Sequence, residues 1–404
     1  MRSKKIIFPD QSDLHTLPVG KPNSLLALQF GAGNIGRGLV GAVLAQSGCQ
    51  VIFADVVEEL IGQINSRGEY IVHVLDKHSY DIQIKGVSAV NSTGPDVIGK
   101  VSEADLVTTA VGLRILQFVA PVLAKGIALR RKKGNEKPLN IIACENGLRA
   151  TSQLKELVYA QLEPDTAVWA DTHIGFPDAA VDRIVPPFHC DDPLDVAVEE
   201  YFEWDIERRS FVGDVPDIGG VMPVDNILAY IERKLLTLNT GHTTAAYLGK
   251  IKGYDTIEEC VRDSELFTAV RAAMQQSGEG LVRKFGFDHN AHFAYIDKIL
   301  SRFSNPFLMD ECNRVGRDPL RKLAPDDRLI LPILNARAFG LPYDKLLPAV
   351  GAALHFDNPE DPQSIELLRS IEKEGLKGTI VKYTGIPEDD PLVPEIAEAY
   401  RKIR

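Results

Sequence analysis

The sequence predicts an α/β fold: a Rossmann-type doubly wound sheet domain followed by a mostly α-helical C-terminal domain. One observation behind this is a glycine-rich turn that links a strand-length apolar run to a helical pattern near the start of the chain. The other is a change in periodicity, because strand-like and helical patterns alternate up to Met222 whereas helical periodicity dominates after Pro223. We therefore expect a poorly ordered arm over 1–24, a dinucleotide-binding domain over 25–222 and a helical substrate domain over 223–404.

The composition limits the possible partners of the chain. It has 45 basic and 56 acidic side chains and a net charge of −11, which argues against nucleic acid or an anionic membrane as a partner. An anionic substrate would then need a local basic pocket. The 5 cysteines are scattered without CxxC spacing, so we expect no disulfide framework and no metal site, and a reducing cytoplasm fits. No apolar run approaches the ~20 residues that span a bilayer, and we expect a monomer or a weak homodimer.

The first element is a strand over 25–30 that leads into the glycine-rich turn over 31–36. A helical pattern follows over 39–44, and a second buried strand over 51–54 ends at Asp55. This succession of strand, turn, helix, strand and acid is typical of a dinucleotide-binding unit. The alternative is an ordinary glycine-rich turn in a sheet protein.

Each glycine of the turn has a mechanical reason. Gly31 permits the tight turn, Gly33 lets the backbone approach a pyrophosphate, and Gly36 lets the helix pack closely on the strand, while the helix N-terminus offers free N–H groups. Asp55 can accept hydrogen bonds from the adenosine ribose, and because no Arg or Lys follows it the expected cofactor is NAD rather than NADP. The residues expected to hold the cofactor here are Gly31, Ala32, Gly33, Asn34, Ile35, Gly36 and Asp55.

Further strands complete the predicted sheet. Short strand-like pieces over 70–75 and 80–87 suggest an antiparallel addition to it. A buried strand over 105–112 leads into a long amphipathic helix over 114–131, and the basic run over 130–133 at its end is expected to be solvated. Ligands sit outside the carboxyl ends of such strands, which places Ala110, Val111 and Gly112 near the nicotinamide half of the cofactor, unless they form a plain turn.

The next buried strand, over 139–144, ends at Glu145, Asn146 and Gly147. A polar side chain at this position can face the substrate. Asn146 is therefore a candidate hydrogen-bond donor to a carbonyl oxygen, or alternatively a helix cap.

A second group of polar residues opens the helical domain. On a continuous α-helix at about 100° per residue, Lys234, His242 and Asn239 fall at about 0°, 80° and 140°, within one half of the surface. Oxidation of an alcohol needs a base for the hydroxyl proton and donors for the developing carbonyl oxygen. Lysine has an ordinary pKa of ~10.4, so burial near a positive ring would have to lower it. The alternative is a surface helix with a capping Asn.

The chain resembles the polyol-specific long-chain dehydrogenases, and among them most closely the mannitol-1-phosphate 5-dehydrogenase branch. The resemblance runs from about Leu26 to the C-terminus. It is carried by FGAGNIGRG (30–38), FAD (53–55), TTAVG (108–112), NIIACEN (140–146), IGFPDAAVDRIVPP (174–187) and ERKLLTLNTGH (232–242). The resemblance implies that Lys234 is the catalytic base, that Asn239 and His242 orient the substrate oxygen, that Asn146 is a second oxygen contact, and that no metal takes part.

A basic segment supplies a candidate phosphate site. Four basic residues fall within nine positions from Arg314 to Lys322 of an otherwise acidic protein. Guanidinium groups suit phosphate because they can bind it bidentately. The candidates are Arg317, Arg321 and Lys322, and the alternative is a solvated basic face.

Together these features predict reversible, NAD-dependent interconversion of D-mannitol 1-phosphate and D-fructose 6-phosphate. A related enzyme acting on an unphosphorylated polyol or a hexuronate is the main alternative. Tyr230 and Lys234 also satisfy the Tyr-x3-Lys spacing of short-chain dehydrogenases, but the glycine spacing and the distance between the two motifs disfavour that family. A protein that only senses NAD on the same fold is a further alternative.

Overall fold

The computed structural model describes residues 24–186 and 192–403, so the expectation for the arm over 1–24 falls almost entirely outside the described residues. Contacts divide the chain into two compact units, with the division between Ile231 and Glu232. This point lies within α7 (Ile227–Arg233). Each unit is described by itself.

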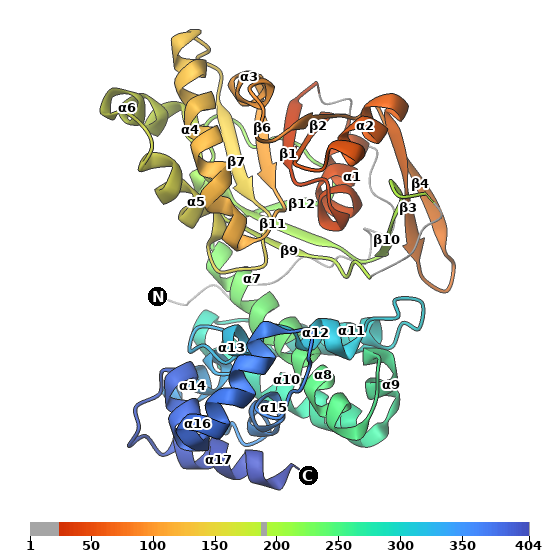
Figure 1. The fold of residues 1–404 in the computed structure, drawn as a ribbon, viewed down its shortest axis with the longest axis vertical. Helices are drawn as coiled ribbons and strands as arrows, with labels where there is room; N and C mark the ends of the chain where they lie inside the picture. Colours follow the sequence, from red (N-terminus) through yellow and green to blue (C-terminus); the bar gives the residue numbers. More distant parts are fainter. Residues whose placement is uncertain (1–23, 187–191, 404) are drawn as a thin grey trace. The chain divides into compact units, whose positions relative to one another are not determined.

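The first unit is built on a six-stranded parallel sheet with the strand order β5-β2-β1-β6-β7-β8 (Figure 1). This is the doubly wound order of a Rossmann fold, in which the chain moves outward from β1 in both directions. The prediction of fold class is therefore confirmed. The strands are β1 (Leu26–Phe30), β2 (Gln50–Asp55), β5 (Ser88–Asn91), β6 (Leu106–Thr109), β7 (Leu139–Ala143) and β8 (Ile174–Gly175).

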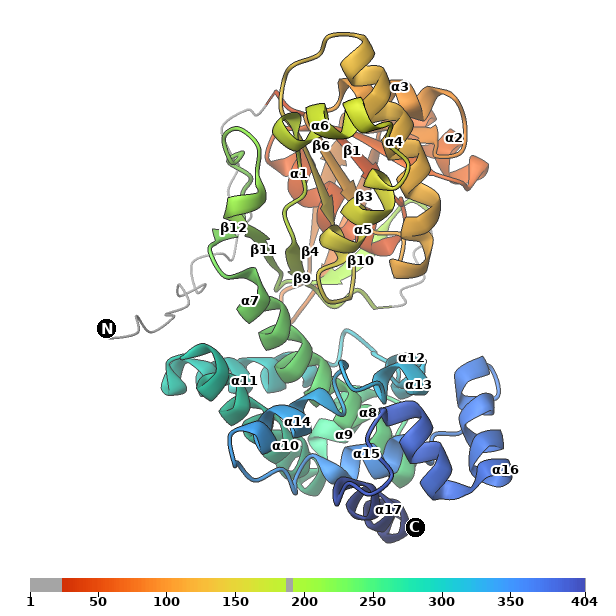
Figure 2. The same ribbon diagram turned by 90° about the vertical axis from the view of Figure 1, so that its left-hand side faces the viewer.

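Alternating side chains of the strands bury opposite faces of this sheet. Ala27 of β1 joins one apolar core and Leu28 joins the other, as the two-residue period of a strand requires. α5 contacts β7 and α4 packs against α5, and Figures 1 and 2 show α4 and α5 side by side. The helices of this unit are α1 (Ala42–Gln46), α2 (Glu58–Arg67), α3 (Asp96–Glu103), α4 (Leu116–Lys132), α5 (Ala150–Tyr159) and α6 (Pro164–His173), with short turns η3 (Leu113–Ile115) and η4 (Arg208–Ser210).

The antiparallel pair predicted after Asp55 exists, but it does not extend the main sheet. β3 (Glu69–Leu75) and β4 (Tyr80–Lys85) pair antiparallel and join β10 (Val196–Glu199) in a separate three-stranded sheet. The physical reason is that both edges of β3 are already paired, one with β4 and the other with β10, so neither edge is available to β5. A third small sheet contains β9 (Ala179–Asp182), β11 (Glu203–Glu207) and β12 (Val221–Val224).

The second unit is helical throughout its elements. A continuous helical segment made of η5 (Lys234–Asn239) and α8 (Thr240–Lys252) packs against the 22-residue helix α10 (Ser264–Phe285). The remaining helices are α9 (Ile257–Arg262), α11 (His289–Phe303), α12 (Cys312–Gly316), α13 (Pro319–Lys322), α14 (Leu331–Ala338), α15 (Leu347–Ala353), α16 (Pro362–Thr384) and α17 (Leu392–Lys402). Among the described residues, no helix is both long and apolar enough to cross a membrane.

Candidate active site

The glycine-rich turn has the shape that was expected from its three glycines. Gly31 has φ +89°, which favours glycine, and a Cβ there would lie 2.5 Å from the carbonyl oxygen of Ala110. At Gly36 a Cβ would lie 2.0 Å from the carbonyl oxygen of Gly31, so the helix and the turn approach too closely for any side chain. At Gly33 a Cβ would meet nothing within 4 Å. Gly31 and Gly36 therefore shape the turn, whereas Gly33 leaves one side of it open.

The helix after this turn begins as a π-turn, η2 (Gly36–Gly41), which the sequence did not reveal. Two side chains from distant segments hold its carbonyl groups. The Tyr70 hydroxyl donates to the Arg37 carbonyl at 2.8 Å, and the Arg183 guanidinium donates to the Gly38 carbonyl at 3.0 Å. Burial lowers the pKa of Arg183 to about 10, against the opposing charge of Glu199, so this side chain is still a cation at neutral pH.

Asp55 lies at the end of β2 and is bound to the turn. Its Oδ2 accepts a hydrogen bond from the Ala32 backbone N–H at 2.7 Å, and its Oδ1 accepts from the N–H groups of Val56 and Val57. A carboxylate has about four acceptor positions, so further donors such as ribose hydroxyls can still be accommodated. Asp55 thus fixes the position of Ala32 as well as supplying the negative charge that disfavours a 2′-phosphate.

A second turn at the carboxyl edge of the sheet follows β6 and contains Ala110, Val111 and Gly112. The carboxylate of Glu145, which is buried at the end of β7, accepts from the Thr109 hydroxyl at 2.7 Å and from the N–H groups of Val111 at 2.9 Å and Gly112 at 2.8 Å. Glu145 thereby holds the turn after β6 to the end of β7. The sequence indicated its position but not this role.

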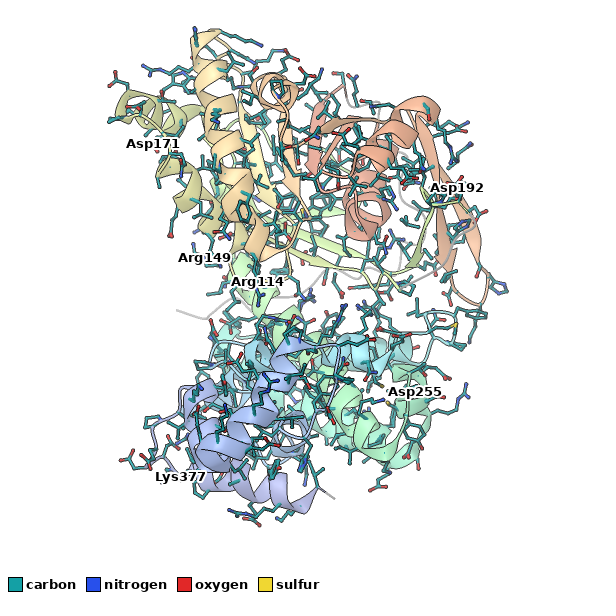
Figure 3. All side chains as sticks on the ribbon, in the orientation of Figure 1. Arg114, Arg149, Asp171, Asp192, Asp255 and Lys377 are labelled. Atoms are coloured by element: carbon teal, nitrogen blue, oxygen red, sulfur yellow. The ribbon has the colours of Figure 1, made fainter. Side chains whose placement is uncertain are left out.

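Asn146 follows Glu145 in the loop before α5. The loop ends at Arg149, which has a left-handed φ of 49° and is labelled in Figure 3. The buried Asp178 accepts hydrogen bonds from the Arg149 guanidinium at 3.2 Å and from the Ser152 hydroxyl at 2.6 Å. Asp178 therefore anchors the end of the loop that carries Asn146.

Lys234 and Asn239, two of the predicted catalytic residues, lie on a π-turn rather than on a continuous α-helix. Lys234 is the first residue of η5 and Asn239 is the last. Because a π-turn pairs residues five positions apart, Lys234 and Asn239 lie on the same side of the helix, not on an arc of about 140°. Lys234 is half-buried and Asn239 is buried. The expectation that these two residues share a face is retained, and the assumed helical geometry is wrong.

The widened turn is supported from outside the helix. The Ser277 hydroxyl of α10 donates to the Leu236 carbonyl, and the Thr240 hydroxyl donates to the Arg328 carbonyl at 2.8 Å. His292 of α11 is wholly buried beside the same turn, with Nε2 3.4 Å from the Thr237 hydroxyl. Packing from three other segments therefore stabilises a helical geometry that is rare on its own.

His242 forms a pair with a carboxylate that the sequence analysis missed. Its Nε2 lies 2.7 Å from Oδ2 of the buried Asp310, and the Arg314 Nε donates to the other oxygen of Asp310 at 2.8 Å. The His242 ring stacks on Phe303 with the centroids 4.8 Å apart. No local pattern links positions 242 and 310, so only the folded chain brings them together.

Electrostatics fix the protonation of this pair. Burial lowers the pKa of His242, and the charges of Arg314 and Arg302 add to that effect against the opposing charge of Asp310. Burial raises the pKa of Asp310, but His242 and Arg314 outweigh it, so this pKa lies below its ordinary value. A neutral His242 then donates Nε2–H to the ionised Asp310, which leaves Nδ1 as a hydrogen-bond acceptor.

The basic side chains between Arg314 and Lys322 have different surroundings in the structure. Arg314 is bound to Asp310, and Arg321 donates to Asp327 at 2.9 Å. Arg317 is exposed and makes no recorded side-chain bond among the described residues. Lys322 is buried, and burial together with the charges of Arg328 and Arg321 places its pKa well below the ordinary value.

Arg328 is a further basic residue near Lys322 that the sequence analysis did not single out. Its Nε donates to Asp327 at 2.7 Å, while its buried Nη2 has no hydrogen-bond partner among the described residues. Lys322 and Arg328 are therefore two buried basic side chains that influence one another electrostatically, and Asp327 bridges Arg328 to Arg321. Within the described ranges, no group of three or more His, Cys, Asp and Glu side chains could hold a metal ion.

Comparison with known protein families assigns the chain to one of them. Residues 26–220 match the model of the mannitol dehydrogenase Rossmann domain, and residues 226–404 match that of the mannitol dehydrogenase C-terminal domain. The chain belongs to the mannitol dehydrogenase family. The chain contains both domains of this oxidoreductase family.

Solved structures agree with the fold of the mannitol dehydrogenase family. The chain is similar to Pseudomonas fluorescens mannitol 2-dehydrogenase in a ternary complex with NAD and D-mannitol, with a TM-score of 0.77 and 18% identity over 94% of this chain and 91% of that chain. It is also similar to a D-sorbitol dehydrogenase, with a TM-score of 0.70 and 15% identity over 89% of this chain and 95% of that one. The NAD in the first complex agrees with the predicted cofactor, whereas the named polyols carry no phosphate.

Proposed function

We propose that this protein is an NAD-dependent polyol dehydrogenase in which Lys234 takes the proton of the reacting hydroxyl and returns it in the reverse direction. The observation that carries the proposal is the π-turn η5, in which Lys234 and Asn239 lie on one side of a helix. His242 follows three residues after Asn239 and is held by the buried Asp310. A base, an amide donor and an oriented imidazole on adjacent turns match the needs of alcohol oxidation.

The residues of the first unit fit a dinucleotide. Gly33 leaves an open approach to backbone N–H groups at the start of a helix, which suits a pyrophosphate. Asp55 keeps acceptor capacity for ribose hydroxyls and would repel a 2′-phosphate, so NAD is favoured over NADP. When bound, NAD accepts a hydride from the carbinol carbon of the substrate.

The protein side chains then divide the remaining work. Lys234 holds the hydroxyl proton, and the Asn239 amide donates to the oxygen that becomes a carbonyl. The neutral His242, with Nε2–H engaged by Asp310, accepts a hydrogen bond from a substrate hydroxyl through Nδ1. Asn146 remains a proposed hydrogen-bond donor to a substrate oxygen. The oxygen donors stabilise charge that develops only as hydride leaves, which is why they accelerate the reaction.

For the substrate we propose D-mannitol 1-phosphate, oxidised to D-fructose 6-phosphate. The buried basic residues Lys322 and Arg328 support this, because the Arg328 Nη2 has no hydrogen-bond partner among the described residues, and a bound dianion would favour the charged form of Lys322. Arg317 and Arg321 remain proposed contacts from the same segment. Unphosphorylated mannitol or sorbitol is the second candidate, and the polyols named for the two similar structures favour it.

Two variants and two substrates test the proposal. Lys234→Ala should bind NADH normally yet lose several orders of magnitude in turnover, whereas Lys250→Ala on the same helical segment should behave as wild type. Turnover of Lys234→Ala near the wild-type rate would refute the base assignment. Steady-state reduction of fructose and of fructose 6-phosphate, measured side by side, separates the two substrates, and a preference for fructose would overturn the phosphate assignment.

A further inference from the structure

The carboxylate of Glu145 is a buried charge at the edge of the sheet where the nicotinamide half of a dinucleotide is expected. It is 7% exposed and is the second residue after β7. Its two oxygens accept three hydrogen bonds, from the Thr109 hydroxyl and from the N–H groups of Val111 and Gly112. Backbone N–H groups can only donate, so the three donors match an ionised carboxylate.

Within the described part of the chain, no basic side chain contacts this carboxylate. Among residues 24–186 and 192–403, no Lys, Arg or His has a recorded hydrogen bond or ion pair with Glu145. A buried charge is normally paired, because its removal from water is costly. The three hydrogen bonds offset part of that cost, and a transient positive charge at the same edge would offset more.

The sheet topology indicates where such a positive charge would lie. The strand order changes direction between β1 and β6, and Asp55 at the end of β2 marks the half of the sheet that takes the adenosine. β6 and β7 belong to the other half, so the turn over 110–112 and Glu145 lie at the nicotinamide half. The oxidised nicotinamide ring carries one positive charge and the reduced ring carries none.

We propose that Glu145 is a specificity-determining residue that biases the site toward the oxidised cofactor. The inference rests on the proposed function, because it requires that the first unit binds NAD. The carboxylate attracts the ring of NAD⁺ and has no such effect on NADH, so it tightens binding of one redox form relative to the other. A unit charge about 10 Å away in a medium of effective dielectric constant about 20 changes an affinity by about one order of magnitude.

The test is the ratio of dissociation constants for NADH and NAD⁺, measured by calorimetry on the full-length protein. We expect Glu145→Gln to shift this ratio by about tenfold toward NADH, because the amide keeps the size of the side chain and removes its charge. Thr109→Val is the matched control. It removes one of the three hydrogen bonds but keeps the charge, so both dissociation constants should change by the same factor. A ratio within twofold of wild type in Glu145→Gln would overturn the proposal and leave Glu145 as a structural anchor.

A measurement on the wild-type protein keeps the proposal falsifiable if Glu145→Gln fails to fold. Benzamide adenine dinucleotide has a neutral ring in place of the oxidised nicotinamide. Wild type should bind NAD⁺ several-fold more tightly than this analogue, and equal or weaker binding of NAD⁺ would overturn the inference while leaving the dehydrogenase proposal intact. Failure of the wild type to bind either NAD⁺ or NADH would overturn both.

Discussion

The buried His292 should make the stability of the helical unit depend on pH. It is 0% exposed, its Nδ1 has no hydrogen-bond partner among the described residues, and Gly278 gives its ring the room it needs. Burial, with the charges of Arg233 and His289, lowers the pKa of His292 from 6.5 to about 3. Between these values the unfolded chain binds a proton that the folded chain does not, so the free energy of unfolding must fall as the pH falls below about 6.5.

The two pKa values give the size of the effect. Between pH 7 and pH 5, His292 should remove about 2 kcal/mol from the free energy of unfolding. In a unit of this size that corresponds to a fall of roughly 5 °C in the midpoint of thermal unfolding. His292→Leu keeps an apolar side chain of similar volume and removes the titration, so it should lack this part of the pH dependence.

The assay must follow the helical unit. Both tryptophans, Trp169 and Trp204, belong to the first unit. Far-UV circular dichroism should therefore be used for urea unfolding at pH 7 and pH 5, and tryptophan fluorescence shows whether the two units unfold together. His78→Gln, at an exposed position, is the control and should keep the wild-type pH dependence. If wild type and His292→Leu lose the same free energy between the two pH values, the reasoning is wrong.

The other predictions concern residues of each unit in turn. Gly33→Ala should fold with wild-type stability and bind NADH more weakly. Gly36→Ala should lose about 3 kcal/mol or more of stability, because its Cβ would lie 2.0 Å from a carbonyl oxygen. Thermal unfolding and NADH titration of both variants check this prediction. Asp310→Asn should lower kcat roughly 10- to 100-fold with NADH affinity unchanged, because His242 is no longer held in one tautomer. A kcat equal to that of wild type would contradict the proposed role of Asp310 in orienting His242. Lys322→Met should raise KM for fructose 6-phosphate by at least tenfold, which corresponds to the loss of about 1.4 kcal/mol of binding from a charged contact. Any reduction of fructose should be unchanged, and an equal effect on both substrates would remove Lys322 from the phosphate site.

Much of the first unit follows from short stretches of sequence. The strand over 25–30, the glycine-rich turn and Asp55 are separated by few residues, so local periodicity and turn chemistry define them before any long-range contact forms. The same is true of the buried strands that end near Gly112 and Asn146. The pairing of β3 with β10 is different, because those segments lie more than 100 residues apart and the sequence of neither strand indicates its partner.

The segment from Lys234 to His242 shows the limit of helical periodicity. A regular α-helix was the natural expectation for Lys234 to His242, and a π-turn was not, since its stability comes from Ser277 and other groups on separate helices. The partner of His242 was likewise missed, because Asp310 is one of many acidic residues and only the packing of α8 against α12 selects it.

Arg130 also shows what the sequence predicts and what only the folded structure reveals. It belongs to a basic run that was expected to be solvated, and its neighbour Arg131 is indeed exposed. Arg130 itself is 0% exposed and donates to the carbonyl groups of Ser102, Ala104 and Lys137. By itself the sequence determined the buried strands that flank the cofactor turn, the turn itself and the identity of the polar residues, because these depend on neighbours along the chain. The tertiary structure alone decided which charges are buried and which carboxylate meets which base, because burial and pairing are properties of surfaces that come together only when the chain folds.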